Sequence, residues 1–258
     1  MNNFFRRALK SPFVIGQRLT KIPRRHDSVV SDLFVWRADK DWNTYFKLFN
    51  ISSFCGEDRV ETVNLVIFDD HGNKIYSNKI QLNEFSINTL NIGKILSNLD
   101  LKTSFGTFSI FHSKNLDLFK KYDSYCAERG YVGYSYKNMP LKSYIHGNLD
   151  AVDNNLFPLG GTSLISRKYN LQFSFNFKSD YEVAIVNNTN KPKRVLLNIN
   201  QSPNDIKSQV IQPLGVKIFL LGDLSVRENF HINLKSRLIM ARPIVFRIDK
   251  NDFDIFHG

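Results

Sequence analysis

Two stretches decide the fold, Tyr45-Phe46-Lys47-Leu48-Phe49-Asn50 and Glu182-Val183-Ala184-Ile185-Val186-Asn187. In both, apolar side chains recur at alternate positions and the run ends in Asn. Alternation with a period of two places one face of a strand on a core and the other toward water, which is typical of an antiparallel sheet. Because the two runs share this pattern and their final Asn, they suggest that one strand occurs twice in the chain.

The features that follow these runs also recur in the same order. Both blocks continue with a second alternating run and then a segment rich in Asp, Asn, Gly or Pro, which predicts a hairpin. Both blocks close on an Arg, an apolar strand and a His-Gly pair. The matches are Phe46 and Leu48 with Val183 and Ile185, Val63, Leu65 and Ile67 with Val195, Leu197 and Ile199, Phe108 and Ile110 with Ile232 and Leu234, and Tyr144-Ile145-His146-Gly147 with Ile255-Phe256-His257-Gly258.

The sequence therefore predicts an all-β protein of two tandem duplicated antiparallel β-sandwich modules. Its 22 Phe and 10 Tyr support strands, because aromatic side chains pack well on a pleated surface. A short helical insertion is expected at 116–128 in the first module, where the apolar spacing changes. We expect a basic N-terminal arm at 1–27, a first module at 28–147, a connecting segment at 148–170 and a second module at 171–258.

The formal net charge of +11 is concentrated at the start of the chain, where the first 25 residues contain basic but no acidic residues. Such an arm can meet a polyanion, either nucleic acid or an anionic membrane surface, or can be a solvated terminus. The candidate polyanion-binding residues are Arg6, Arg7, Arg18, Arg24 and Arg25.

The two cysteines, Cys55 and Cys126, do not occupy matching places in the repeat. This argues against a duplicated disulfide framework and suits a reducing compartment. No apolar run has the length of a signal-peptide core or of a membrane span. We therefore expect a cytoplasmic protein, with an organellar transit peptide as the alternative for the Arg-rich start.

His146 and His257 are the histidines that the repeat relates. As catalytic residues they would act as general acid and base, or share a metal or an anion with Asp150 and Asp153 as oxygen donors. Alternatively, each imidazole ends a closing strand and hydrogen-bonds a backbone group. No metal site or cofactor is assigned.

Ligand-binding candidates lie around the closing strands. Arginine forms forked contacts with carboxylates or phosphates, and tyrosine rings offer stacking surfaces to sugars or bases. The structural alternatives are a salt bridge to a neighbouring strand for each arginine and a place in the core for some of the rings. The candidates are Arg129, Arg242, Tyr131, Tyr134 and Tyr136, with Tyr144 as a further ring.

Asn50-Ile51-Ser52 and Asn187-Asn188-Thr189 fit the acceptor pattern for N-glycosylation at equivalent points of the repeat. Asn and Ser or Thr side chains also bond the nearby backbone where a strand ends. Without a secretory signal, the sequence favours this second role.

Enzyme signatures such as a glycine-rich phosphate loop, a nucleophile elbow, His-Glu-x-x-His and Cys-x-x-Cys are absent from the sequence. The leading hypothesis is a non-catalytic interaction protein that binds an anionic polysaccharide or a protein partner. The alternatives are an enzyme with a histidine-containing site at the module interface and a nucleic-acid-binding protein that uses the basic arm. The oligomeric state stays open.

Overall fold

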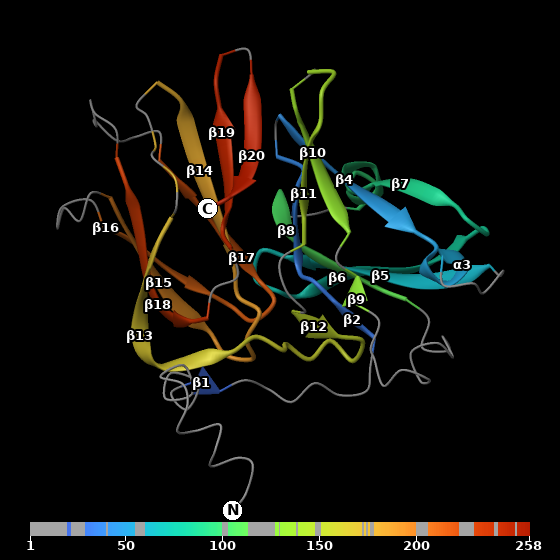
Figure 1. Ribbon diagram of the computed structural model, residues 1–258, viewed down its shortest axis with the longest axis horizontal. Coiled ribbons are helices and arrows are strands. Elements are labelled where there is room, and N and C mark those ends of the chain that lie inside the picture. The colour runs from blue at the N-terminus through green and yellow to red at the C-terminus, as the bar shows by residue number, and fades with distance from the viewer. Residues whose placement is uncertain are drawn as a thin grey trace, which may run out of the picture.

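The computed structural model confirms an all-β architecture of antiparallel sheets packed as sandwiches (Figure 1). Two short helices, α3 (Ile51–Phe54) and α4 (Ile92–Leu96), occur among the residues that the structure describes. These residues are 20–21, 29–39, 41–54, 60–99, 103–112, 127–128, 130–137, 139–147, 151–171, 173, 175, 178–199, 206–221, 230–239, 242–250 and 252–258.

The first sandwich consists of two four-stranded sheets, on the right in Figure 1. We call them the tyrosine sheet and the hairpin sheet. The rings of Phe46 on the first and Phe34 and Phe108 on the second meet between them, with centroid distances of 4.8 and 5.6 Å from Phe46. The tyrosine sheet has the order β11 (Ser143–His146), β10 (Tyr131–Tyr136), β4 (Trp42–Phe49), β7 (Ile87–Asn91), and the hairpin sheet β3 (Phe34–Arg37), β8 (Phe105–Phe111), β5 (Glu61–Asp69), β6 (Lys74–Leu82).

The second sandwich lies on the left in Figure 1 and consists of sheets that we call the middle sheet and the basic sheet. Their order is β17 (Val216–Leu220), β14 (Asp180–Val186), β19 (Ile244–Ile248), β20 (Phe253–His257) in the middle sheet and β1 (Thr20–Lys21), β13 (Thr162–Asn170), β18 (Ile232–Leu238), β15 (Lys193–Ile199), β16 (Ile206–Ile211) in the basic sheet. A small sheet contains β12 (Val152–Asp153), β2 (Val30–Ser31) and β9 (Ala127–Glu128).

The two sandwiches have the same strand order. The order β11-β10-β4-β7 corresponds to β20-β19-β14-β17, and β3-β8-β5-β6 to β13-β18-β15-β16. Residues matched in the sequence also take equivalent ladder positions, because Leu65 pairs with Ile110 as Leu197 pairs with Leu234. The predicted hairpins β5–β6 and β15–β16 are confirmed.

The segments between the matched strands contribute two further strands, β9 and β13. The expected connecting segment 148–170 contains β13, which pairs with β18 and therefore belongs to the second sandwich. Of the expected helical insertion, only Ala127 and Glu128 lie within the described residues, and they form β9 beside β2.

The strand ends that carry the Asn motifs are built alike. Asn50 and Asn187 are fully buried, and their side-chain amides donate to the carbonyls of Leu82 and Ile211, which are equivalent positions on β6 and β16. Their Oδ1 atoms accept hydrogen bonds from the following turn, at 2.6 Å from Ser52 Oγ and 2.7 Å from Thr189 Oγ1. The interpretation of these motifs as turn formers is confirmed, since buried amides do not accept a glycan.

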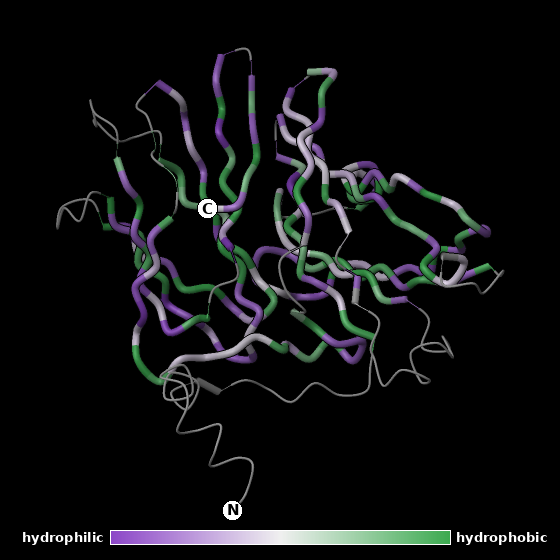
Figure 2. The backbone as a smooth tube through the Cα atoms, viewed as in Figure 1, coloured by the Kyte–Doolittle hydropathy of each residue, from purple (hydrophilic) through white to green (hydrophobic). Residues whose placement is uncertain are grey.

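The middle sheet is buried on both faces. Val183 and Val245 point into the core of the second sandwich, whereas Ala184 and Phe246 belong to the core of the first. The ring of Phe246 lies 5.1 Å from Trp42 and 5.2 Å from Tyr134 of the tyrosine sheet, measured between centroids. The second sandwich therefore supplies one wall of the first core. Figure 2 shows hydrophobic and hydrophilic residues alternating along strands of both sandwiches.

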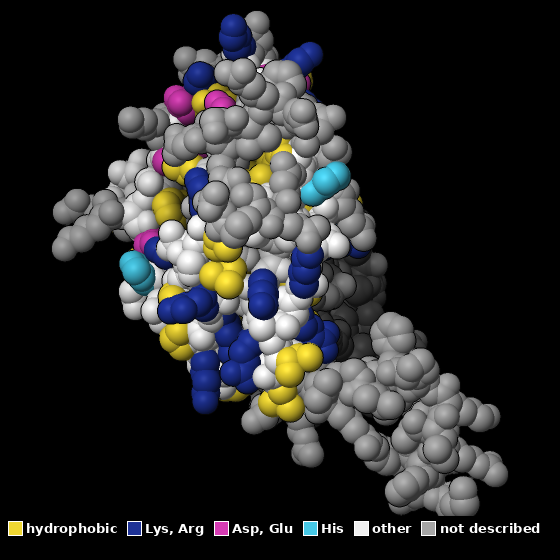
Figure 3. All heavy atoms as spheres, turned by 90° about the vertical axis from the view of Figure 1, so that its left-hand side faces the viewer, with side chains coloured by type: hydrophobic (Ala, Val, Ile, Leu, Met, Phe, Trp, Pro, Cys, Tyr) yellow, Lys and Arg dark blue, Asp and Glu magenta, His cyan; other side chains and the backbone are white. Residues whose placement is uncertain are grey.

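The outer face of the basic sheet, on the side of the molecule shown in Figure 3, carries clustered Lys and Arg side chains. Among the helices of the described residues, none has the length and apolar character needed to cross a membrane.

Candidate functional site

The outer face of the tyrosine sheet combines aromatic rings with cations. Strand pairing places His146, Tyr131, Lys47 and Thr89 in one row across the sheet. The next row contains Tyr144, Gly133, Tyr45 and Asn91. Tyr131 is 51% exposed and Tyr144 37% exposed. None of the four strands contains an Asp or Glu, and the positive charges come from Lys47 on β4 and from Lys142, which precedes β11.

The rings on this face are held by their neighbours. A Cβ added at Gly133 would lie 2.4 Å from the ring of Tyr144, which therefore lies directly over this glycine. The ammonium of Lys142 sits 4.0 Å from the ring centroid of Tyr45, and Lys47 Nζ donates to Thr89 Oγ1 at 2.8 Å. Rings and cations in such contact form a semi-rigid surface that loses little side-chain entropy on binding.

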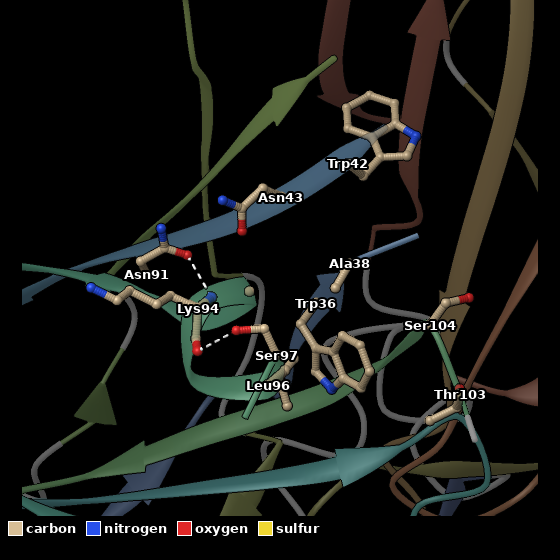
Figure 4. Close-up of a pocket in the computed structure, with 11 residues that line it drawn as sticks. Trp36, Ala38, Trp42, Asn43, Asn91, Lys94, Leu96, Ser97, Thr103 and Ser104 are labelled. Atoms are coloured by element: carbon tan, nitrogen blue, oxygen red, sulfur yellow. Dashed lines mark hydrogen bonds between the residues drawn. The ribbon is translucent and has the colours of Figure 1, made fainter. Parts of the chain in front are cut away.

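A hollow of about 650 Å³ continues this face at the end of the first sandwich (Figure 4). Asn43 and Asn91 belong to both, since Asn43 Nδ2 donates to the hydroxyl of Tyr45 at 2.9 Å and Asn91 pairs with Tyr45 across the sheet. The other lining residues supply indoles, hydroxyls and one ammonium, from Trp36, Trp42, Ser97, Thr103, Ser104 and Lys94, together with the small or aliphatic residues Ala38, Gly93 and Leu96. This mixture of amides, hydroxyls and indole edges suits a polyhydroxylated ligand.

A second hollow of about 420 Å³ shares Ala38, Trp42 and Ser104 with the first and reaches the middle sheet. Its buried Arg37 pairs with Asp39 and Glu182 and lies 4.8 Å from the rings of both Trp42 and Phe246. These contacts span the two sandwiches, so we assign Arg37 a joining role.

The structure brings His146 and His257 together. They sit on the neighbouring edge strands β11 and β20, with ring centroids 5.0 Å apart. His257 Nε2 lies 3.1 Å from the carbonyl oxygen of His146, and His146 Nδ1 lies 2.5 Å from that of Gly147. Burial lowers the pKa of His257 and the charge of Arg242 acts in the same direction, whereas the hydrogen bonds to the backbone of His146 and Pro243 oppose this shift. These contacts fit the alternative in which each imidazole ends a closing strand and hydrogen-bonds a backbone group.

The described residues hold no group of three or more His, Cys, Asp or Glu side chains arranged to bind a metal ion. Of the two expected oxygen donors, Asp150 lies outside the described residues. Asp153 is buried and accepts hydrogen bonds from the backbone amides of Asn155 and Phe157, at 2.9 Å each. Asp153 therefore stabilises a turn.

The remaining site candidates divide between surface and core. Tyr134 is fully buried and its hydroxyl donates to the carbonyl of Val35 at 2.9 Å, while Tyr136 packs beside Trp42. Both rings belong to the first core, and Tyr136 also lines the second hollow. Arg242 is exposed next to β19. Arg129 lies outside the described residues, as do Arg6, Arg7, Arg18, Arg24 and Arg25 of the arm.

A buried charged triad was missed by sequence reasoning. His112 lies between two carboxylates, with Nδ1 2.8 Å from Glu61 Oε1 and Nε2 2.6 Å from Glu128 Oε2, and all three side chains are almost fully buried. Burial lowers the pKa of His112, but hydrogen bonds to Glu128 and Glu61 outweigh it and raise the pKa to about 9. The imidazolium therefore ties β5 and β8 to β9, and both its nitrogens are used.

Comparison with known proteins gives no family: no protein-family model, no curated protein and no solved structure matches the chain.

Proposed function

We propose that the protein is a non-catalytic binding protein that holds an anionic polysaccharide on the outer face of the tyrosine sheet. The observation that carries the proposal is a sheet face with Tyr45, Tyr131 and Tyr144 beside Lys47 and Lys142, built from strands without a single carboxylate.

Each group on this face has a role in the proposed complex. Pyranose rings stack on the tyrosine faces, as apolar sugar surfaces do on aromatic rings. The ammonium groups of Lys47 and Lys142 pair with carboxylate, sulfate or phosphate groups of the polymer. Asn43 and Asn91 then hydrogen-bond sugar hydroxyls where the chain enters the hollow of Figure 4.

We further propose that the two sandwiches are copies of one ancestral unit, which their identical strand order and matched ladder positions support. The face equivalent to the polysaccharide site is covered in the second sandwich, because the outer side of the middle sheet packs into the first core. The protein therefore offers one such site per chain, and the two sandwiches have different roles.

The test is titration calorimetry with a panel of acidic and neutral polysaccharides. The variants Tyr131→Ala and Tyr144→Ala are each expected to weaken binding of an acidic polymer by about tenfold, the loss of one stacking contact. The double variant Lys47→Gln with Lys142→Gln is expected to weaken the binding of acidic polysaccharides but not of neutral ones. This loss of affinity is expected to be smaller at high salt.

Phe157→Ala is the matched control, since Phe157 is an exposed ring outside the tyrosine sheet. Wild-type affinity in both tyrosine variants, or no binding of any acidic polysaccharide by the wild-type chain, would contradict the proposed function.

A second candidate is an enzyme whose site includes His146 and His257, and the 5.0 Å approach of their rings is the observation that favours it. Here the two imidazoles act as general acid and base on a substrate at the junction of the sandwiches. Loss of polysaccharide cleavage in His146→Ala with His257→Ala, at unchanged polysaccharide affinity, would support this candidate. The absence of any cleavage by the wild-type protein would remove it.

A further inference from the structure

The basic sheet presents a second face without acidic side chains, on the opposite sandwich. None of its strands β1, β13, β15, β16 and β18 contains Asp or Glu. Inward-pointing residues of these strands, such as Val195, Leu197 and Leu234, fill the second core. The alternate residues therefore form the outer face, which lies on the side of the molecule seen in Figure 3.

Strand pairing fixes how cations and aliphatic groups are distributed on this face. One row across the sheet reads Lys168, Lys235, Leu196 and Ser208. Beside it, Arg194 pairs with Val210. Cations and apolar side chains are therefore neighbours on this face, as the dark blue and yellow groups of Figure 3 illustrate.

Exposed aliphatic side chains frame the cations. Leu164 and Ile165, which are 43% and 57% exposed, project where the pairing of β13 with β18 is interrupted between Thr162 and Arg167. On β16, the edge strand at the far side of the sheet, Ile206 and Val210 are 49% and 44% exposed. Leu164 and Ile165 are adjacent exposed aliphatic side chains, and contiguous exposed apolar groups mark interaction sites.

The cations on this sandwich repel each other in the free protein. The pKa of Lys193 is lowered, first by partial burial and then by the positive charges of Arg237 and Lys191. An anionic partner would relieve this repulsion. Thr20 and Lys21, which lie within the expected arm, pair with the start of β13 and so add to the same sheet.

We propose that the outer face of the basic sheet docks the protein on an anionic lipid surface. Arg194, Lys235 and Arg237 meet the phosphate groups of the lipid headgroups, and Leu164, Ile165 and Val210 reach the boundary with the acyl chains. The arrangement places the tyrosine sheet, on the other sandwich, away from the membrane contact.

A lipid surface explains this face better than a nucleic acid does. Both attract lysine and arginine, but single-stranded nucleic acid is recognised by stacking rings and duplex backbone by polar contacts. The outward residues of this sheet are aliphatic where they are not polar, and its Tyr169 is directed at the second core. Transfer of aliphatic side chains from water to acyl chains is favourable, whereas contact with phosphate groups removes no apolar surface from a polar environment.

The experiment is co-sedimentation of the full chain with vesicles of phosphatidylcholine alone and of phosphatidylcholine with phosphatidylglycerol. We expect binding to the mixed vesicles only. The variant Arg194→Gln with Lys235→Gln is expected to lower the partition coefficient by about thirtyfold, since each cation near an anionic surface contributes about a factor of five. Leu164→Ser with Ile165→Ser is expected to weaken binding severalfold, most visibly at high salt where the charges are screened.

Lys47→Gln with Lys142→Gln on the tyrosine sheet is the matched control, because it removes the same charge from another face and is expected to bind vesicles like the wild type. Equal binding to both vesicle types, or unchanged binding in the Leu164 and Ile165 variant, would overturn the proposal. Loss of affinity for a double-stranded oligonucleotide in the Arg194 and Lys235 variant, with vesicle binding intact, would assign the face to nucleic acid and overturn it as well.

Discussion

His112 shows how one residue can make stability depend on pH. Its pKa is raised from 6.5 to about 9 in the folded protein, so its contribution is fully present below about pH 6.5 and is lost as pH rises through about 9. We expect the free energy of unfolding to fall by about 3 kcal/mol over this window. Urea titrations at several pH values check this, and the fall should disappear in His112→Gln.

Replacing His112 also has a cost at neutral pH. Its removal leaves Glu61 and Glu128 buried without their shared cation, so His112→Gln is expected to lower the free energy of unfolding by about 3 to 5 kcal/mol. His146→Gln, at an exposed imidazole, is the control and should change stability little. Equal stability of the two variants at pH 7 would refute a charged triad.

The buried amides at the strand ends give a paired prediction. Asn50→Ala and Asn187→Ala each remove one amide that satisfies carbonyls of the neighbouring strand and groups of the following turn. Each is expected to cost about 2 to 3 kcal/mol, because buried partners lose their hydrogen bonds. Chemical denaturation measures both, with the exposed Asn170→Ala as control. A large effect at only one of them would show that the two strand ends are not energetically equivalent.

The strands were predictable where one face meets a core and the other meets water. The alternation in β4, β5 and β15 gave both their type and their inward residues, and Leu48, Leu65 and Leu197 are indeed buried. Alternation also separates Tyr131 from Tyr134, because an odd spacing along a strand puts two side chains on opposite faces.

Other features depend on contacts that no local pattern contains. His112 meets Glu61 and Glu128 from positions 51 and 16 residues away, and neither separation has a periodic signature. The double burial of the middle sheet appears in the sequence as short runs of consecutive apolar residues, such as Val183-Ala184-Ile185-Val186 and Ile244-Val245-Phe246, and buried helices share such runs. The sequence also showed no strand signal for β13, because the consecutive exposed residues Leu164 and Ile165 interrupt the alternation of apolar and polar side chains.

The shared core predicts that the two sandwiches unfold together. Phe246 of the middle sheet packs in the first core and Phe219 of the same sheet in the second. Phe246→Ala and Phe219→Ala are each expected to cost about 3 to 5 kcal/mol and to shift one common calorimetric transition. Two separate heat-absorption peaks in either variant would disprove this coupling.

The middle sheet has a practical consequence for dissecting the chain. The outward residues of the middle sheet complete the core of the neighbouring sandwich. A cut between Gly147 and Ala151 would therefore expose core residues on the N-terminal fragment and a complementary apolar surface on the C-terminal fragment. Two such pieces, produced separately and mixed, should recombine into a working whole. The protein is thus suited to split-reporter designs in which reassembly signals the proximity of two fused tags.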